Sequence, residues 1–168
     1  LEMTQTVLQW NYCYNEDLMY VILEIKNNSD SDYHDFAFGL YVDLDVGANE
    51  NPGENGQTND LVGSDSSENL AWIYDADGYD PGWKAECGIM GTKFIETPQG
   101  IGMTSFRTGD WALVPDDDPR KYTMIDGTQF DGTIPPADQY YVQCTRGIDL
   151  LMDSTIRVVF AIIAGADE

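Results

Sequence analysis

Positive charge is scarce in this sequence: Lys and Arg number 8 among 168 residues, against 30 Asp and Glu, and the formal net charge is −22. Nucleic acids and anionic membrane surfaces are bound through clustered Lys and Arg. The composition therefore argues against both partners. It also leaves most carboxylates without a cationic side chain beside them, and crowded like charges destabilise a compact state.

Histidine and cysteine are nearly absent as well. His34 is the only histidine, and it stands among turn residues without a nucleophile motif such as Gly-x-Ser-x-Gly, so a catalytic triad is disfavoured and a surface turn position is expected. Cys13, Cys87 and Cys144 are odd in number and lack the paired spacing of zinc ligands. Two alternatives stay open for them: one disulfide with one free thiol, or three buried thiols.

Long hydrophobic runs are missing too. The longest, residues 158–164, is far shorter than a membrane span, and no signal peptide is present. Both ends of the sequence fall beside expected strands. We therefore expect residues 1–168 to form one module of a longer secreted protein, from which any targeting segment has been removed.

Turn-forming and apolar residues are abundant. The sequence contains 16 Gly and 7 Pro, Asp outnumbers Glu by 21 to 9, and 42% of the residues are apolar. Asp, Gly and Pro favour turns over helices, while the apolar fraction is that of a globular chain. The composition predicts an all-β fold, an antiparallel β-sandwich of the jelly-roll or Ig-like kind, with long acidic loops and at most one short helix.

Alternating apolar residues predict the strands of this sandwich. Asp118-Pro119 predicts a short helix over residues 118–124, with Asp118 as its cap, and Asp116–Asp118 are interpreted as loop and cap residues. Residues 44–69 are predicted to be one long acidic loop. The predicted strands cover residues 6–12, 17–26, 36–43, 70–74, 88–95, 102–106, 139–144 and 155–164.

The acidic residues are densest where cationic ones are absent. Between Asn27 and Trp83 there are thirteen Asp and Glu and no Lys or Arg. Aspartates alternating with Gly and Asn suit Ca²⁺, which takes six to eight oxygen ligands. We expect a structural Ca²⁺ held by Asp43, Asp45, Asp60 and Asp65, which together order the long loop. Asp75, Asp77 and Asp80 form a second, weaker candidate, and residues 75–78 could equally be a simple turn.

The acidic segment has two other interpretations. A solvated acidic loop needs no ion at all. An EF-hand is disfavoured, because Gly47 falls at the fifth position when Asp43 is the first, and a strand precedes the loop.

Several segments together resemble a known family. They are residues 41–47 (Tyr-Val-Asp-Leu-Asp-Val-Gly), 59–65 (Asn-Asp-Leu-Val-Gly-Ser-Asp), 70–78, 22–30 and 153–165. This set is similar to an uncharacterised Asp-rich β-sandwich module of large secreted or cell-surface bacterial proteins, which often lies beside peptidase or fibronectin-like domains. The resemblance implies a non-catalytic β-sandwich, located outside the bacterial cell, whose partners include the neighbouring domains of a longer chain.

Two other functions were considered. A carbohydrate-binding module would use flat aromatic faces, and Trp83 and Trp111 are candidates, whereas Trp10 and Trp72 are expected in the core. The ligand of an interaction module could thus be a protein or a glycan. A hydrolase would need a positioned pair of carboxylates, and chance pairs are certain in so acidic a chain.

Overall fold

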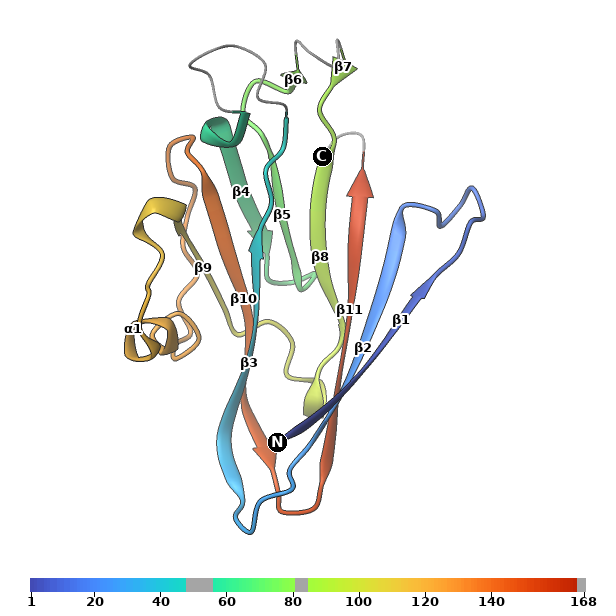
Figure 1. Ribbon diagram of the computed structural model, residues 1–168, viewed down its shortest axis with the longest axis vertical. Coiled ribbons are helices and arrows are strands. Elements are labelled where there is room, and N and C mark those ends of the chain that lie inside the picture. Colours follow the sequence, from blue (N-terminus) through green and yellow to red (C-terminus); the bar gives the residue numbers. More distant parts are fainter. Residues whose placement is uncertain (48–55, 81–84, 166–168) are drawn as a thin grey trace.

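A computed structural model describes residues 1–47, 56–80 and 85–165. Over these residues the chain forms two antiparallel sheets packed face to face, with one short helix beside the smaller sheet (Figure 1). This architecture is a β-sandwich, so the predicted all-β fold class is confirmed.

The larger sheet has six strands in the order β1-β2-β11-β8-β5-β4, each antiparallel to its neighbours. The strand β1 is one edge of this sheet and β4 is the other. The strands are β1 (Glu2–Gln9), β2 (Leu18–Lys26), β4 (Asp60–Asp65), β5 (Leu70–Asp75), β8 (Ile89–Glu96) and β11 (Thr155–Gly165).

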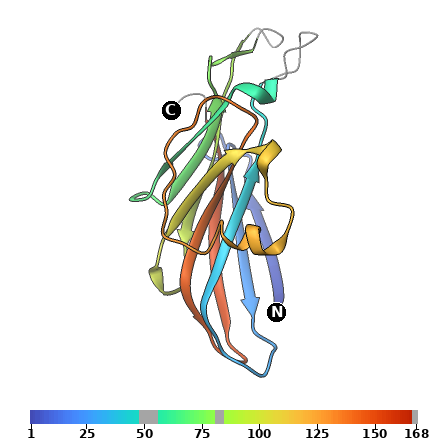
Figure 2. The ribbon, with the colours of Figure 1, turned by 90° about the vertical axis from the view of Figure 1, so that its left-hand side faces the viewer.

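The smaller sheet has three strands in the order β3-β10-β9, and a two-stranded ribbon, β6-β7, lies apart from it. Figure 2 views the molecule from the side that carries the smaller sheet and the helix. The strands are β3 (Tyr33–Asp43), β9 (Ser105–Asp110), β10 (Gln139–Leu150), β6 (Tyr79–Asp80) and β7 (Ala85–Glu86).

The core fills the space between the two sheets. Phe36, Phe38, Leu40 and Val42 alternate along β3 and pack against it, as their shared face predicted. The larger sheet supplies the opposite wall with residues that alternate in the same way, among them Val21, Leu23, Ile25, Val62, Ala71 and Ile73.

A buried polar chain also joins the two sheets. The Thr92 hydroxyl on β8 lies 2.9 Å from the Tyr141 hydroxyl on β10 and donates to the Gln143 side-chain oxygen at 2.9 Å. The Gln143 amide donates in turn to the Asn69 carbonyl at 2.6 Å. These contacts set the two sheets in register with each other, because each buried polar group needs its partner.

Helical segments are few and short. The one α-helix of the described residues, α1 (Asp118–Tyr122), begins where Asp-Pro predicted it, but its cap is Asp117, whose carboxylate accepts from the Arg120 N–H at 2.9 Å. No helix among the described residues is long and apolar enough to cross a membrane. The 3-10 turns are η1 (Gly56–Asn59), η2 (Pro98–Gly100) and η3 (Trp111–Leu113).

Several expectations about strands were wrong in detail, among them the strand predicted over 139–144, which is β10 and continues to Leu150. The predicted long loop 44–69 contains β4, which was not predicted because Gly63 and the aspartates at both ends of the strand interrupt the alternation of apolar residues. Pairing with β5 stabilises it. The strand predicted over 102–106 is β9, which begins later, and the strand predicted over 6–12 is β1, which begins earlier. The ends of both strands are set by pairing with the neighbouring strand and not by the local residue pattern.

Candidate functional site

Five aspartates gather at one end of the sandwich, at the top of Figure 1, which we call the acidic end. Asp43 is the last residue of β3, Asp75 is the last of β5 and Asp60 is the first of β4. Asp45 follows β3, and Asp138 directly precedes β10. Antiparallel strands bring these chain segments to the same end although they are far apart in sequence.

Asp60 is the centre of this group. The alternation along β4 points Asp60 into the sandwich with Val62, and its side chain is 0% exposed. Its peptide group is fixed by two hydrogen bonds with Ala137, of 3.0 and 3.3 Å. Its Oδ1 accepts from the Val46 N–H at 3.2 Å, whereas Oδ2 has no hydrogen-bond partner among the described residues. A buried carboxylate oxygen without a partner is unfavourable as an anion, and binding of a proton or a cation would stabilise it.

The surroundings make the negative form of Asp60 unfavourable. Burial is the main cause and raises the pKa of Asp60 to about 8, with the charges of Asp45, Asp75 and Asp138 adding to it and the Val46 N–H opposing it. Among the described residues, no Lys or Arg forms an ion pair with Asp43, Asp45, Asp60 or Asp75. Among the described residues, one backbone N–H, that of Val46, stabilises the Asp60 carboxylate, and no basic side chain does.

Asp75 lies directly opposite Asp60 in the β4–β5 pair and is 7% exposed. Its Oδ1 accepts from the N–H groups of Asp77 and Gly78, at 2.9 and 2.7 Å, and its Oδ2 accepts from the Asn59 side-chain amide at 2.9 Å. Burial is the main cause that raises the pKa of Asp75. The Asn59 Oδ1 is a second buried oxygen without a partner among the described residues.

A small cavity of about 190 Å³ opens at the acidic end, lined by Asp43, Asp45, Asp138 and Trp111. Asp43 and Asp45 are exposed, so their carboxylates can change rotamer. The pKa of Asp43 is raised, first by burial and then by the Asp45 charge, against the hydrogen bond that it accepts from the Tyr41 hydroxyl at 3.2 Å.

The structure places Asp65 at the opposite end of β4 and Asp77 at the rim of the acidic end, next to Asp75. Asp65 ends β4 and accepts from the Ser67 N–H and hydroxyl at 2.9 and 2.6 Å, which forms the hairpin turn to β5. Five residue steps along a strand separate it from Asp60, about 17 Å. Asp77 is exposed and accepts from the Tyr79 N–H at 3.1 Å, and Gly78 has a positive φ. Residues 75–78 therefore form a turn, which was one of the two alternatives for this segment.

The donor chemistry of the acidic end fits a hard cation. Asp60 Oδ2 and Asn59 Oδ1 are buried oxygens with unused lone pairs, and three further carboxylates stand around Asp60. The side chains do not already form a closed shell: among the described residues no three His, Cys, Asp or Glu are arranged to hold a metal. Closure around an ion would take rotation of the exposed Asp43 and Asp45.

Sequence reasoning missed two members of this group, Asp138 and Asn59. Asp138 is an isolated aspartate directly before a predicted strand, and only the strand order brings it to Asp60. Asn59 stood beside a predicted ligand, and its backbone carbonyl accepts from the Ala76 N–H at 2.9 Å, which closes the end of the β4–β5 pair.

An apolar groove of about 510 Å³ adjoins the acidic end. It lies between β3 and the segment that leads into α1, and Trp111 borders both the groove and the acidic cavity with 55% of its surface exposed. Its other lining residues include Tyr41, Val114, Met124, Ile125 and Val142.

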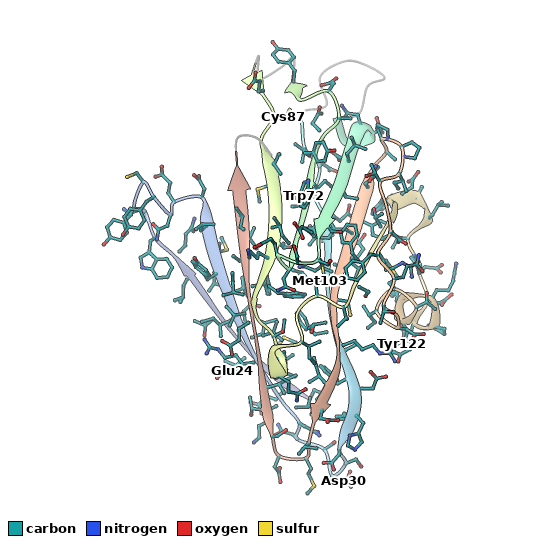
Figure 3. All side chains as sticks on the ribbon, turned by 180° about the vertical axis from the view of Figure 1, so that it is seen from behind. Glu24, Asp30, Trp72, Cys87, Met103 and Tyr122 are labelled. Atoms are coloured by element: carbon teal, nitrogen blue, oxygen red, sulfur yellow. The ribbon has the colours of Figure 1, made fainter. Side chains whose placement is uncertain are left out.

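The remaining tryptophans differ from expectation. Trp10, expected in the core, is 40% exposed beside the uncovered edge strand β1, with its ring 6.0 Å from that of Tyr20. Trp72, also expected in the core, is half-buried on the outer face of β5, over Gly63 (Figure 3). Trp83 lies outside the described residues.

Histidine and cysteine take no part in the acidic end. His34 is in β3 and not in a turn, and its Nδ1 lies 2.8 Å from Asp149, which raises the pKa of His34. The three cysteines form no disulfide: Cys13 is exposed, and Cys87 and Cys144 are buried. The alternative with one disulfide was therefore wrong. The alternative with three buried thiols was wrong for Cys13, which lies on the exposed turn after β1.

Comparison with known proteins adds no relative. No protein-family model matches the chain, and no curated protein is significantly similar to it. The β-sandwich implied by the family resemblance is confirmed by the fold, while the family itself stays a hypothesis.

Proposed function

We propose that this chain is a non-catalytic, calcium-stabilised β-sandwich module with a structural or interaction role in a larger secreted or cell-surface bacterial protein. The observation that carries the calcium proposal is Asp60, wholly buried, with one carboxylate oxygen lacking a partner among the described residues. The extracellular and bacterial setting rests on the resemblance to Asp-rich surface modules.

The proposed ligands are Asp60, Asp75 and Asp45, with Asp138 and the Asn59 side-chain oxygen completing the shell. All five belong to segments that meet at the acidic end, and all offer the oxygen donors that Ca²⁺ selects. Asp43 and Asp77 stand at the rim of this group. Of the four first-choice ligands, the proposal therefore keeps Asp45 and Asp60, moves Asp43 to the rim and gives up Asp65, which lies at the far end of β4.

Such an ion would stabilise the sandwich by linkage. It would join the end of β3 to the starts of β4 and β10 and the end of β5, so it would bind the folded chain and not the unfolded one. It would also neutralise carboxylates that otherwise repel each other. The bound ion supplies charge and coordination only, and no chemical step is assigned to it.

Catalysis by the same carboxylates is disfavoured by access. A raised pKa suits a general acid at neutral pH, but a general acid must reach the reacting atom within hydrogen-bond distance. Asp60 has no exposed surface, so a polymeric substrate cannot reach its carboxyl group.

The test is thermal unfolding and calorimetric titration of metal-free protein with Ca²⁺. At a Ca²⁺ concentration about a hundred times the Kd, the melting temperature should rise by about 5 to 10 °C. Asp75→Asn should abolish most of the rise, whereas Asp65→Asn, which changes the charge equally at the other end of β4, should leave it in place. A wild-type protein that shows neither binding heat nor a shift with Ca²⁺ would refute the proposal.

Carbohydrate binding is the second candidate, favoured by one observation. The exposed Trp111 ring borders both an apolar groove and an acidic cavity, a combination that suits stacking on a sugar ring and hydrogen bonding to its hydroxyls. Glycan-array binding that Trp111→Ala abolishes and Trp10→Ala retains would support it. An array without signal would leave the groove with no role in sugar binding.

A further inference from the structure

The edge strand β1 is unusual in this acidic molecule. Every residue of β1 is exposed, and residues 3–15 form a stretch of thirteen residues without a single charged side chain. Several large apolar side chains are exposed in the same region, namely Leu1, Met3, Val7, Leu8, Trp10, Tyr12 and Tyr14.

Sheet edges in soluble proteins are normally protected against pairing with another chain, by charge, proline, bulges or short length. The opposite edge, β4, is only six residues long, starts and ends with aspartate, and is bridged to Ala137. The long strand β3 carries Asp35 and Asp43. In contrast, β1 pairs with β2 in unbroken register over eight residues, contains no Pro or Lys, and has Glu2 as its only charge.

One face of β1 continues the apolar surface of the core. Met3 lies opposite Ile25 and Val7 opposite Val21, and both of these β2 residues are buried in the sandwich. Met3 and Val7 point to the same side of the sheet as their partners but remain 57% and 47% exposed, because the three-stranded sheet does not extend over β1 (Figure 1).

We propose that β1 is the homodimer interface of this protein, pairing antiparallel with β1 of a second copy to give a continuous twelve-stranded sheet. Pairing centred on Gln5 puts Met3 of each copy opposite Val7 of the other, an apolar cross-strand pair on the core side. The same register puts Glu2 opposite Leu8, so no like charges face each other. A strand can therefore pair with its own copy here without an electrostatic penalty along the edge.

Charge favours this edge over the opposite edge of the same sheet, β4, for contact between two copies. The acidic end includes β4, which is five strand spacings from β1 in the six-stranded sheet, about 24 Å away. Dimerisation through β1 places the two acidic ends on the outside of the assembly. Repulsion between chains of net charge −22 still opposes association, so the dimer should tighten as salt is added, the opposite of binding to a basic partner.

Sedimentation velocity over a wide range of protein concentrations, at physiological and at high salt, tests the dimer. The wild type should associate more strongly at high salt, and Val7→Glu should raise the dissociation constant at least about tenfold by opposing the apolar pair with a charge. Ile95→Glu is the matched control, because Ile95 is also exposed (51%) but lies on the interior strand β8.

Cysteine trapping tests the register. In a Cys13→Ser background, Gln5→Cys should form a disulfide-linked dimer under mild oxidation, since the two copies of residue 5 face each other. Gln9→Cys should not, because its two copies are eight positions apart, about 26 Å. A monomer at every concentration and salt, equal association of Val7→Glu and Ile95→Glu, or trapping of Gln9→Cys instead of Gln5→Cys would overturn the proposal. These outcomes do not depend on Ca²⁺, and the experiments are run both with Ca²⁺ and with EDTA.

Discussion

Asp60 and Asp75 face each other across the β4–β5 pair, and both side chains point into the sandwich, where they are almost wholly buried. Like charges directly opposite in a sheet destabilise it. At this position the cost is larger, because burial already disfavours each negative charge. A proton or a cation can relieve the repulsion, and the two give different dependences of stability on pH.

Without divalent cations, the protein should become less stable as the pH rises. The folded-state pKa of Asp60 is about 8, above its ordinary value of 3.8, so the folded form holds the proton more tightly than the unfolded form. The stability that this tighter proton binding at Asp60 contributes is complete below about pH 4 and is lost towards pH 8. The free energy of unfolding should fall by at most about 1.4 kcal/mol per pH unit. Urea unfolding in EDTA at a series of pH values measures it, and Asp60→Asn should flatten the dependence.

With Ca²⁺ in excess, this dependence of stability on pH should flatten over the same range. The ion needs the deprotonated carboxylate, so lowering the pH sets protons in competition with it. The stabilisation that Ca²⁺ adds over the value in EDTA should therefore shrink as the pH drops from 8 towards 5. A wild-type protein whose stability in EDTA rises with pH between 4 and 8 would contradict the assignment of a raised pKa to Asp60.

Thr92→Val should destabilise the fold by about 1–3 kcal/mol, because it leaves the Tyr141 hydroxyl and the Gln143 oxygen buried without their partner. Tyr141→Phe is the matched comparison: it removes one hydroxyl together with its own hydrogen bond and should cost only about 1 kcal/mol. Chemical unfolding of the two variants compares them. Equal costs for both would mean that Thr92 does not couple the two sheets.

Gly63→Ala should destabilise the β4–β5 hairpin by about 1–3 kcal/mol. A Cβ at residue 63 would lie 2.6 Å from the Trp72 ring, which covers this glycine from the opposite strand. Gly132→Ala is the control, since a Cβ there meets no atom within 4 Å. Urea unfolding followed by tryptophan fluorescence measures both, and a Gly63→Ala protein as stable as the control would show that the ring moves away at no cost.

The strands that sequence reasoning found are those whose side chains alternate strongly. Phe36, Phe38, Leu40 and Val42 identified both β3 and its buried face. The strand β4 was missed because Asp60, Gly63 and Asp65 break that pattern, and its stability comes from β5 and Ala137. For the same reason Asp60 and Asp65 read as members of one loop, although they are opposite ends of one strand.

The sequence by itself determined the all-β class, the alternating core and the excess of unpaired acids, because these follow from composition and from a two-residue period. The tertiary structure decided which acids meet. Strand order places Asp138 beside Asp60, and the inward alternation of β4 buries that carboxylate. It also decided that β1 is an uncovered edge, since a strand's position within a sheet depends on its pairing partners and not on its own residues.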